Sequence, residues 1–480
     1  MNNNYLPSDY QTFIATSRYA RWLDDEGRRE TWGETVERYL ENIAKTWLKP
    51  VDLQEVRDAI LSLEVMPSMR SMMTAGKAAD RDNTCMYNCS YLPVDDPKSF
   101  DEAMFILLCG TGVGFSVERQ FITKLPDVPT LFQSETCVVI KDSKEGWAKG
   151  LRQVLALLWA GEIPKWDVSK VRPAGARLKT FGGRASGPAP LIDLFNFAVT
   201  TFRQAQGRKL SSLECHDLMC KIGEVVVVGG VRRSAMISLS NLSDDRMRHA
   251  KSGNWWENAA HRALANNSVS YSEKPDSMAF MREWTALMES GSGERGIFNR
   301  EASIKQAAKN GRRESCYEFG TNPCSEIILR PNQFCNLTEV VIRATDGLED
   351  LTRKVRLATV LGTIQSTYTN FPYLRKVWST NTEAERLLGV SLTGIMDNKL
   401  MTLDNKGLSE TLEHLKNVAI STNAEWADRL GIPHSTAITC VKPSGTVSQL
   451  VDSASGIHAR HSPYYIRTVR GDNKDPLTEF

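Results

Sequence analysis

The sequence lacks long apolar runs, an excess of charge of either sign and an amino-terminal signal peptide. No stretch approaches the length that crosses a bilayer, and residues 1–10 lack the basic and apolar regions of a secretory leader. The 59 basic and 57 acidic residues nearly cancel, which disfavours a partner recognised through charge alone. We therefore expect a cytoplasmic globular protein with no membrane contact and no direct nucleic-acid binding.

The usual cysteine patterns of metal sites are also missing. Ten cysteines without a leader favour reduced thiols, among them a catalytic pair, over a disulfide framework. Cys85 and Cys89 are four apart, but the residue three further on is leucine, so the iron–sulfur pattern of radical enzymes that use S-adenosylmethionine is incomplete. The cysteines and histidine within 215–220 lack a distant second ligand pair. We predict no metal site.

Apolar spacing divides the chain into two parts. Positions three and four residues apart predict an N-terminal helical region over residues 1–65. Over residues 66–480, short apolar segments such as the valine run 225–228 alternate with helical ones, which favours a mainly parallel α/β core. Further helices are predicted at 277–290, 348–370 and 408–430.

An amide, a thiol and a carboxylate lie within five residues at 322–326. Pro323 biases its neighbour toward extended backbone, in which Asn322, Cys324 and Glu326 would project to one face. A carboxylate beside the thiol disfavours a thiolate nucleophile. A thiol that loses a hydrogen atom needs no thiolate, and the carboxylate can act as a base on a substrate hydroxyl. The pattern indicates radical chemistry; the alternative is a buried, inert cysteine and a solvated strand residue.

Several glycine-rich turns could contact phosphate. Residues 109–115 hold three glycines but lack the dinucleotide-binding spacing and a phosphate-binding lysine. Segments 181–188 and 229–235 pair glycines with arginine. Segment 442–447 offers backbone N–H groups and hydroxyls beside a lysine. The alternative for each is a plain surface loop.

Taken together and in this order, these segments resemble the catalytic chain of ribonucleotide reductases. The resemblance is specifically to the monomeric, adenosylcobalamin-dependent (class II) ribonucleoside-triphosphate reductases, and it spans nearly the whole chain. It is carried by segments 65–70, 88–89, 110–114, 181–188, 229–235, 266–269, 293–300, 322–326, 334–337, 442–446 and 455–465. It implies a ten-stranded α/β barrel, incomplete at its carboxyl end, with a central finger loop whose tip carries Cys324.

The resemblance also implies catalytic roles. Cys324 would become a transient thiyl radical that abstracts the ribose 3′ hydrogen. Glu326 would be the base on the 3′ hydroxyl, and Asn322 would orient the ribose. Cys89 and Cys335 would be the reducing pair, which ends the reaction as a disulfide.

Two further sets of residues follow from the same resemblance. Those expected to line the substrate and its phosphates are Ser68, Asn88, Ser444, Gly445 and Thr446. Those expected in the loops that sense an effector are Arg232, Arg233, Gly182, Gly183 and Arg184. Glycine-rich loops suit such coupling between two sites, because they can hold two arrangements.

Cofactor and partners are expected on the same ground. The resemblance implies adenosylcobalamin as the radical source, a ribonucleotide substrate, a deoxynucleoside triphosphate effector and a thioredoxin-like reductant. Chains of the family continue past the point that matches Phe480. We therefore expect the last barrel strand and the redox tail to be missing here, which makes a separate carboxyl-terminal half a further partner.

Two alternatives remain open at this point. The first is the large subunit of a class I reductase, which receives its radical from a second, metal-containing protein. The second is a non-catalytic nucleotide-binding half of a split reductase. A glycyl-radical enzyme would need a carboxyl-terminal glycine loop that the sequence does not contain.

Overall fold

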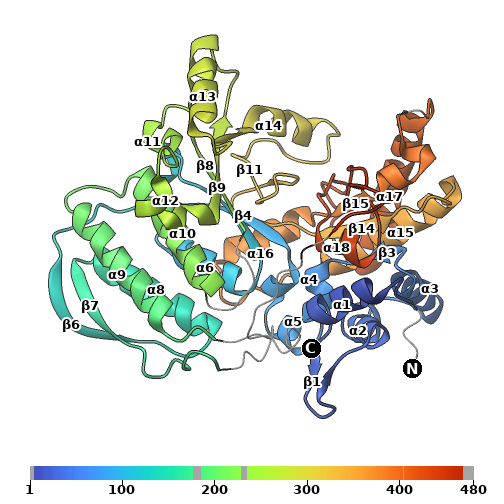
Figure 1. Cartoon of the computed structure of the whole chain (residues 1–480), viewed down its shortest axis with the longest axis horizontal. Coiled ribbons are helices and arrows are strands. Elements are labelled where there is room, and N and C mark those ends of the chain that lie inside the picture. Colours follow the sequence, from blue (N-terminus) through green and yellow to red (C-terminus); the bar gives the residue numbers. More distant parts are fainter. Residues whose placement is uncertain (1–4, 177–184, 229–234, 404, 467, 469–480) are drawn as a thin grey trace. The chain divides into compact units, whose positions relative to one another are not determined.

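A computed structural model describes residues 5–176, 185–228, 235–403, 405–466 and 468 (Figure 1). The chain forms two compact units. Unit 1 comprises Met1–Asn88, Phe334–Pro372 and Lys376–Phe480, and unit 2 comprises Cys89–Gln333 and Tyr373–Arg375. The helices of residues 1–65 fall in unit 1, and a separate domain ending at residue 65 stays a prediction.

Unit 1 opens with the predicted helical region. Its elements are α1 (Asp9–Arg18), β1 (Trp22–Leu23), β2 (Arg28–Arg29), α2 (Trp32–Tyr39), a π-helical turn (Leu40–Ala44) and α3 (Pro50–Leu61). A capping box between Thr31 and Glu34 starts α2, because each satisfies a backbone N–H near the first turn. Pro50 starts α3, since its fixed φ suits the first helical position. The helical expectation for this region is confirmed, apart from the short β1–β2 hairpin.

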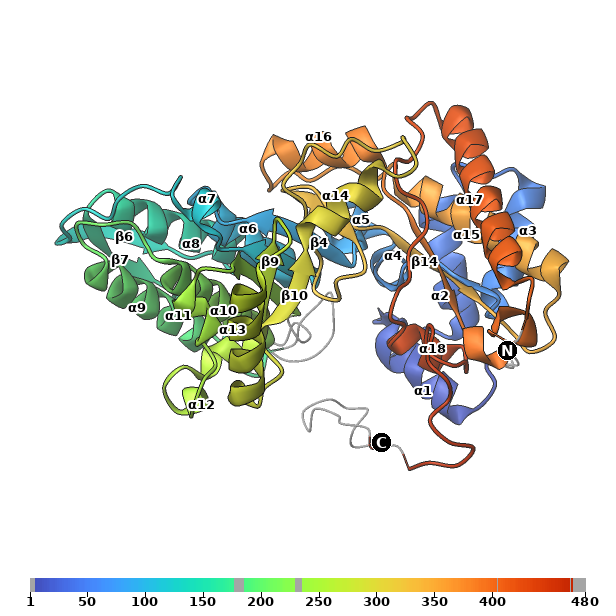
Figure 2. The same ribbon diagram turned by 90° about the horizontal axis from the view of Figure 1, so that it is seen from above.

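A three-stranded sheet lies at the centre of unit 1. Its order is β15 (Gly389–Thr393), β14 (Leu337–Val341) and β3 (Val65–Met66), with β14 parallel to β15 and antiparallel to β3. The helices α15 (Leu348–Gln365) and α17 (Leu408–Leu430) pack side by side (Figure 2). Both predicted helices are confirmed, although α15 ends at Gln365 rather than at residue 370.

Short elements complete unit 1. They are α4 (Met69–Thr74), α5 (Lys77–Arg81), a 3-10 turn (Asn83–Met86), α16 (Lys376–Glu385), two further 3-10 turns (Ile395–Asp397 and Lys399–Met401) and α18 (Thr446–Leu450).

Five parallel strands form the main sheet of unit 2. Their order is β10 (Gly296–Asn299), β9 (Ala265–Tyr271), β8 (Met236–Asn241), β5 (Gly112–Ser116) and β4 (Cys89–Pro93). The short β13 (Gln333–Phe334) follows β4 in this order, and the chain passes from unit 2 to unit 1 within it. The mainly parallel α/β core predicted from the alternation of segments is confirmed.

The structure corrects the expectation for the valine run 225–228. It was expected as a short apolar segment between helices, but it forms the last turn of α10 (Ser212–Val228). Buried apolar residues recur along α10 three or four positions apart, at Cys215, Leu218, Ile222 and Val226. That spacing continues the helix through a run whose β-branched residues favour strands.

A smaller layer of unit 2 lies within residues 119–204. Strands β6 (Phe132–Val139) and β7 (Glu162–Asp167) pair in parallel, and α8 (Lys144–Trp159) and α9 (Ala189–Gln204) pack beside them (Figure 1). The other helices of unit 2 are α6 (Lys98–Leu108), α7 (Arg119–Ile122), α11 (Asp245–Arg248), α12 (Trp255–Asn258), a 3-10 turn (Ala260–Leu264), α13 (Ser277–Ser290) and α14 (Arg300–Ala308).

The predicted helix at 277–290 is confirmed with both ends. Asp276 caps the first turn of α13 by accepting from the N–H groups of Met278 and Ala279, and Gly291 ends it in the left-handed conformation.

Across the described residues, no helix combines the length and apolar character needed to span a membrane.

The buried carboxylate of Asp101, on α6, predicts a pH dependence of stability. Burial raises its pKa from 3.8 to about 6, although Arg152 and Tyr373 donate hydrogen bonds to it. A carboxyl group whose pKa rises on folding stabilises the fold in its protonated form. Its contribution is therefore complete below the unfolded pKa and is lost as the pH rises through the folded pKa. Relative to Asp101→Asn, the free energy of unfolding should fall by roughly 3 kcal/mol between acid and neutral pH.

Urea unfolding across this pH range measures the effect. The matched control is Asp127→Asn, because the side chain of Asp127 is 72% exposed. Equal pH profiles for the two variants would contradict the prediction.

Candidate active site

The segment 322–327 forms the tip of a short hairpin in unit 2. Strands β11 (Gly320–Thr321) and β12 (Ile328–Leu329) pair antiparallel below it. The N–H of Ser325 donates to the carbonyl oxygen of Asn322 at 2.9 Å, and Ser325 has a φ of +62°. The expected extended backbone is therefore wrong: Pro323 occupies the second position of a tight turn, which its fixed φ favours.

The turn nevertheless brings the amide and the carboxylate together. Asn322 Nδ2 donates to Glu326 Oε2 at 2.6 Å, and Asn322 Oδ1 accepts from the N–H of Ile327 at 3.0 Å. Asn322 is fully buried, while Cys324 is exposed at the tip. The interpretation of Cys324 as a buried, inert residue is excluded. The hairpin presents a thiol to the outside and holds Glu326 in one orientation.

Glycines let the hairpin lie directly against the sheet. A methyl group placed on Gly114 of β5 would lie 1.8 Å from the carbonyl oxygen of Thr321. One placed on Gly320 would lie 2.1 Å from the ring of Tyr91, which belongs to β4. The glycine-rich segment 109–115, considered above as a weak nucleotide motif, thus provides the surface on which the hairpin rests.

Three of the predicted substrate residues line one cavity in unit 1. The cavity has a volume of about 170 Å³, and Ser68, Asn88 and Thr446 contribute to its wall. Ser68 Oγ donates to Asn88 Oδ1 at 2.7 Å, which joins the start of α4 to the residue before β4. The remaining lining residues are Pro67, Met69, Leu337, Thr338, Glu339, Lys442 and Val447.

The sequence prediction missed Glu339, which organises this cavity. Glu339 Oε1 accepts from Lys442 Nζ at 2.7 Å, and Oε2 accepts from Ser444 Oγ at 2.6 Å. Ser444 and Gly445 do not line the cavity. A signal for Glu339 was present, since it is the only charged residue of the buried strand β14, and a buried carboxylate needs partners.

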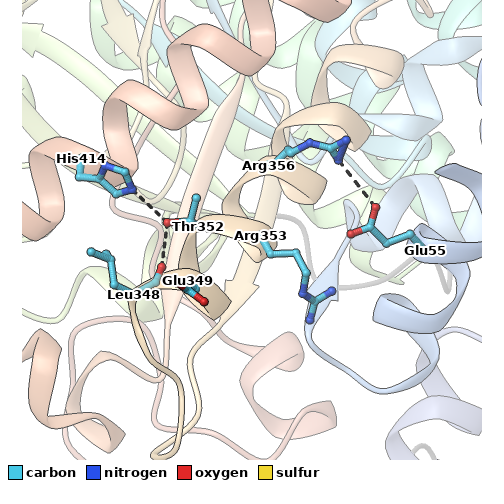
Figure 3. A pocket seen from close by; sticks show the side chains of 7 residues that line it. All are labelled: Glu55, Leu348, Glu349, Thr352, Arg353, Arg356 and His414. Carbon is cyan, nitrogen blue, oxygen red and sulfur yellow. Dashed lines mark hydrogen bonds and ion pairs between the residues drawn. The ribbon is translucent and has the colours of Figure 1, made fainter.

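A larger hollow in unit 1 contains none of the predicted residues. It has a volume of about 600 Å³ and is lined by residues of α3, α15 and α17 (Figure 3). Arg356 forms an ion pair with Glu55 at 3.8 Å, and Arg353 forms one with Glu64. Because both arginines face carboxylates, the hollow has little attraction for an anion.

The two expected reducing cysteines fall in different units. Cys89 is the first residue of β4 in unit 2 and is half-buried. Cys335 follows β13 in unit 1 and is buried, next to the aromatic ring of Phe334 that stacks on Tyr87. Their pairing stays a prediction.

The expected effector residues Arg232, Arg233, Gly182, Gly183 and Arg184 lie outside the described residues. Within the described part of the chain, no three or more histidine, cysteine, aspartate or glutamate side chains are grouped so as to hold a metal ion.

Comparison with known proteins shows which family the chain is similar to. Residues 119–201, which include the β6–β7 layer, match the model of the B12-dependent ribonucleotide reductase insertion domain. The adenosylcobalamin-dependent ribonucleoside-triphosphate reductase of Lacticaseibacillus paracasei is 28% identical over 96% of this chain and 74% of that protein. The chain is similar to the adenosylcobalamin-dependent (class II) ribonucleotide reductases. The enzyme of the same name from Lactobacillus leichmannii is also 28% identical, with the same coverage.

Solved structures share the fold. A crystal structure of a B12-dependent (class II) ribonucleotide reductase superposes with a TM-score of 0.78 at 24% identity, covering 93% of this chain and 74% of that one. The class Id alpha subunit of Actinobacillus ureae gives a TM-score of 0.58 at 12% identity, covering 99% of this chain and 78% of that one. The fold is thus more similar to the class II structure than to the class Id subunit. Closure of a ten-stranded barrel stays a prediction.

Proposed function

We propose that this chain reduces ribonucleotides to 2′-deoxyribonucleotides through a thiyl radical on Cys324. One observation carries the proposal: the hairpin presents an exposed thiol two residues from a carboxylate that a buried amide orients. A thiol beside a carboxylate suits hydrogen-atom transfer, because the negative charge of Glu326 disfavours the thiolate.

In the proposed reaction, different residues of the chain carry out different steps. The Cys324 radical takes the 3′ hydrogen of the ribose, and Glu326 accepts the proton of the 3′ hydroxyl. The 2′ hydroxyl leaves as water with a proton from one cysteine of the pair Cys89 and Cys335. That pair supplies two electrons and becomes a disulfide, and Cys324 returns its hydrogen atom to carbon 3′. Asn322 fixes the carboxylate throughout, through its 2.6 Å hydrogen bond.

The cavity of unit 1 supports a site for the substrate. Ser68, Asn88 and Thr446 provide hydroxyl and amide groups at its wall, where Lys442 is paired with Glu339. Ser444 and Gly445 shape the loop behind it, since Ser444 is bound to Glu339. The relatives are named for ribonucleoside triphosphates, which supports a triphosphate as the substrate of this chain.

Adenosylcobalamin would supply the radical that removes the hydrogen atom from the Cys324 thiol. The structure fits a large cofactor in one respect: the thiol lies at the exposed tip of the hairpin and is not buried among side chains. Pro323 and Ser325, which adjoin Cys324 in the turn, would contact the cofactor.

The remaining partners follow from the family. We propose a thioredoxin-like reductant for the oxidised cysteine pair and a deoxynucleoside triphosphate effector at the segments with Arg232, Arg233 and Gly182–Arg184. We also propose a cytoplasmic location, where such a reductant keeps thiols reduced.

A single-turnover experiment tests the proposal. The full chain is mixed without oxygen or reductant with adenosylcobalamin and a ribonucleoside triphosphate. We expect about one deoxynucleotide per chain, because the cysteine pair holds two electrons. Mass spectrometry after alkylation should then show a disulfide between Cys89 and Cys335.

The control is Cys335→Ser, which should form neither the disulfide nor a full equivalent of product. If the unaltered chain forms no deoxynucleotide, the proposed activity is wrong, and the non-catalytic nucleotide-binding half is the better interpretation.

A further inference from the structure

A buried ion pair lies beside the base of the Cys324 hairpin. Arg300, in the first turn of α14, donates from Nη1 to Glu118 Oε1 at 2.8 Å and from Nη2 to Oε2 at 2.6 Å. The two side chains are only 4% and 2% exposed. A bidentate pair fixes both position and orientation, so the guanidinium has one location.

The third donor of the same guanidinium holds the hairpin. Arg300 Nε donates to the carbonyl oxygen of Phe319 at 2.7 Å, and Phe319 is the residue directly before β11. This contact lies five positions before Cys324 in the sequence. Any shift of Arg300 therefore moves the strand that leads to the thiol.

Glu118 is itself fixed to the end of β5. Ser116 Oγ donates to Glu118 Oε2 at 2.7 Å, and Gln120 Nε2 donates to Oε1 at 3.1 Å. Arg300 thus links the main sheet, through Glu118, to the start of the hairpin. Glu118 lies two residues after β5, the strand on which Gly114 leaves no room for a methyl group beside the Thr321 carbonyl oxygen.

The other strand of the hairpin has a second support. Arg313 Nη1 donates to the carbonyl oxygen of Ile328, in β12, at 2.9 Å. Its guanidinium also lies over the ring of Phe319, 4.8 Å from the centroid. Two arginines therefore hold the two sides of the hairpin. Arg300 donates to the carbonyl oxygen of Phe319, and Arg313 donates to that of Ile328.

Such support is needed because the hairpin is too short to hold its own shape. Strands β11 and β12 have two residues each. An isolated two-stranded hairpin is at best marginally stable in water. Contacts to the rest of unit 2 must therefore determine where the tip lies.

We propose that Arg300, held by Glu118, is a positioning residue that sets the register of the hairpin against β5 and so the location of the Cys324 thiol. Its effect on catalysis rests on the proposed function. Its effect on the hairpin does not, and the two can be measured separately.

The test is Arg300→Lys, which keeps the charge but loses the planar fork of donors. The matched control is Arg295→Lys. Arg295 donates to both carboxylate oxygens of Glu283, at 2.5 and 2.8 Å, and that pair is equally buried in unit 2. Its described contacts are with Glu283, β8 and the residue after β8, and none of them is with the hairpin.

The first measurement needs neither cofactor nor substrate. The N–H groups of Ser325 and Ile327 are bonded within the hairpin tip, so their hydrogen exchange reports its order. Arg300→Lys should speed their exchange at least tenfold. Arg295→Lys should leave their exchange unchanged, although it should lower the melting temperature by about as much as Arg300→Lys does. Unchanged exchange in Arg300→Lys, or equal acceleration in both variants, would overturn the proposal. Glu118→Gln, which keeps the acceptor oxygen, should give a smaller acceleration and serves if Arg300→Lys fails to fold.

The second measurement is kinetic. A displacement of about 1 Å at a reacting group costs on the order of 100-fold in rate. We expect kcat of Arg300→Lys to fall by about that factor, with KM within about twofold, because the cavity of unit 1 is lined by other residues. A change in KM alone would contradict a positioning role. If the unaltered chain makes no deoxynucleotide, the proposed function fails, while the exchange result still decides the role of Arg300.

Discussion

Replacement of Cys324 by serine should abolish deoxynucleotide formation, leaving less than about 0.01% of the activity on the usual scale of an essential catalytic group. Serine is nearly the same size, and its O–H bond is too strong to lose a hydrogen atom in place of the S–H bond. Because Cys324 is exposed at the tip of the hairpin, the substitution does not alter the packing of the core. We therefore expect the melting temperature and nucleotide binding to stay close to those of the unaltered chain.

The measurement is an anaerobic product assay with adenosylcobalamin, together with nucleotide binding by calorimetry. Cys316→Ser is a suitable control, since Cys316 is also exposed and lies in the same unit. It should keep full activity. Activity in Cys324→Ser above about 1% of the unaltered chain would show that another group abstracts the hydrogen atom.

The second large effect is expected at Gly114. A methyl group there would lie 1.8 Å from the Thr321 carbonyl oxygen, far inside contact distance, so Gly114→Ala must push β11 away from β5. We expect kcat to fall about 100-fold or more, because the displacement is transmitted to the tip. We also expect a loss of about 1–3 kcal/mol in the free energy of unfolding, which is typical of overpacking.

Two other glycines make this prediction specific. At Gly112, the nearest atom to an added methyl group is Pro323 Cγ at 3.0 Å, so Gly112→Ala should have a milder effect. At Gly33, in α2, no atom lies within 4 Å, and Gly33→Ala should be neutral or slightly stabilising. Equal activity of the Gly114 and Gly33 variants would show that the hairpin does not depend on this contact.

Features encoded locally were predictable from the sequence. The helices at 277–290 and 408–430 were placed to the residue, since apolar spacing marks their length and their ends have local causes. Gly291 and Gly431 both adopt positive φ directly after these helices, which is the usual role of glycine at a helix end. The chemistry of segment 322–326 could also be read locally, because its three functional groups lie within five residues.

Features that depend on distant partners were not predictable. The turn at Ser325 replaces the extended backbone that alternation assumed, since the hairpin closes through Asn322. Glu118 and Arg300 are 182 residues apart, and Glu339 and Lys442 are 103 apart. Even where a lone carboxylate in an apolar run marks itself, as Glu339 does, no local pattern names its partner, because the pairing is a property of the assembled fold.

The division into two units also sets the order in which the chain can fold during its synthesis. Unit 2 is almost continuous, from Cys89 to Gln333, so its sheet can form as soon as that stretch has left the ribosome. The sheet of unit 1 cannot form so early, because its strand β3 pairs through Met66 with Glu339, which is synthesised much later. At ordinary translation rates, the amino-terminal helices wait roughly 15 to 60 s for their partner strand. During that time their apolar faces have no native partner sheet, and they are the part of the nascent chain on which chaperones would act.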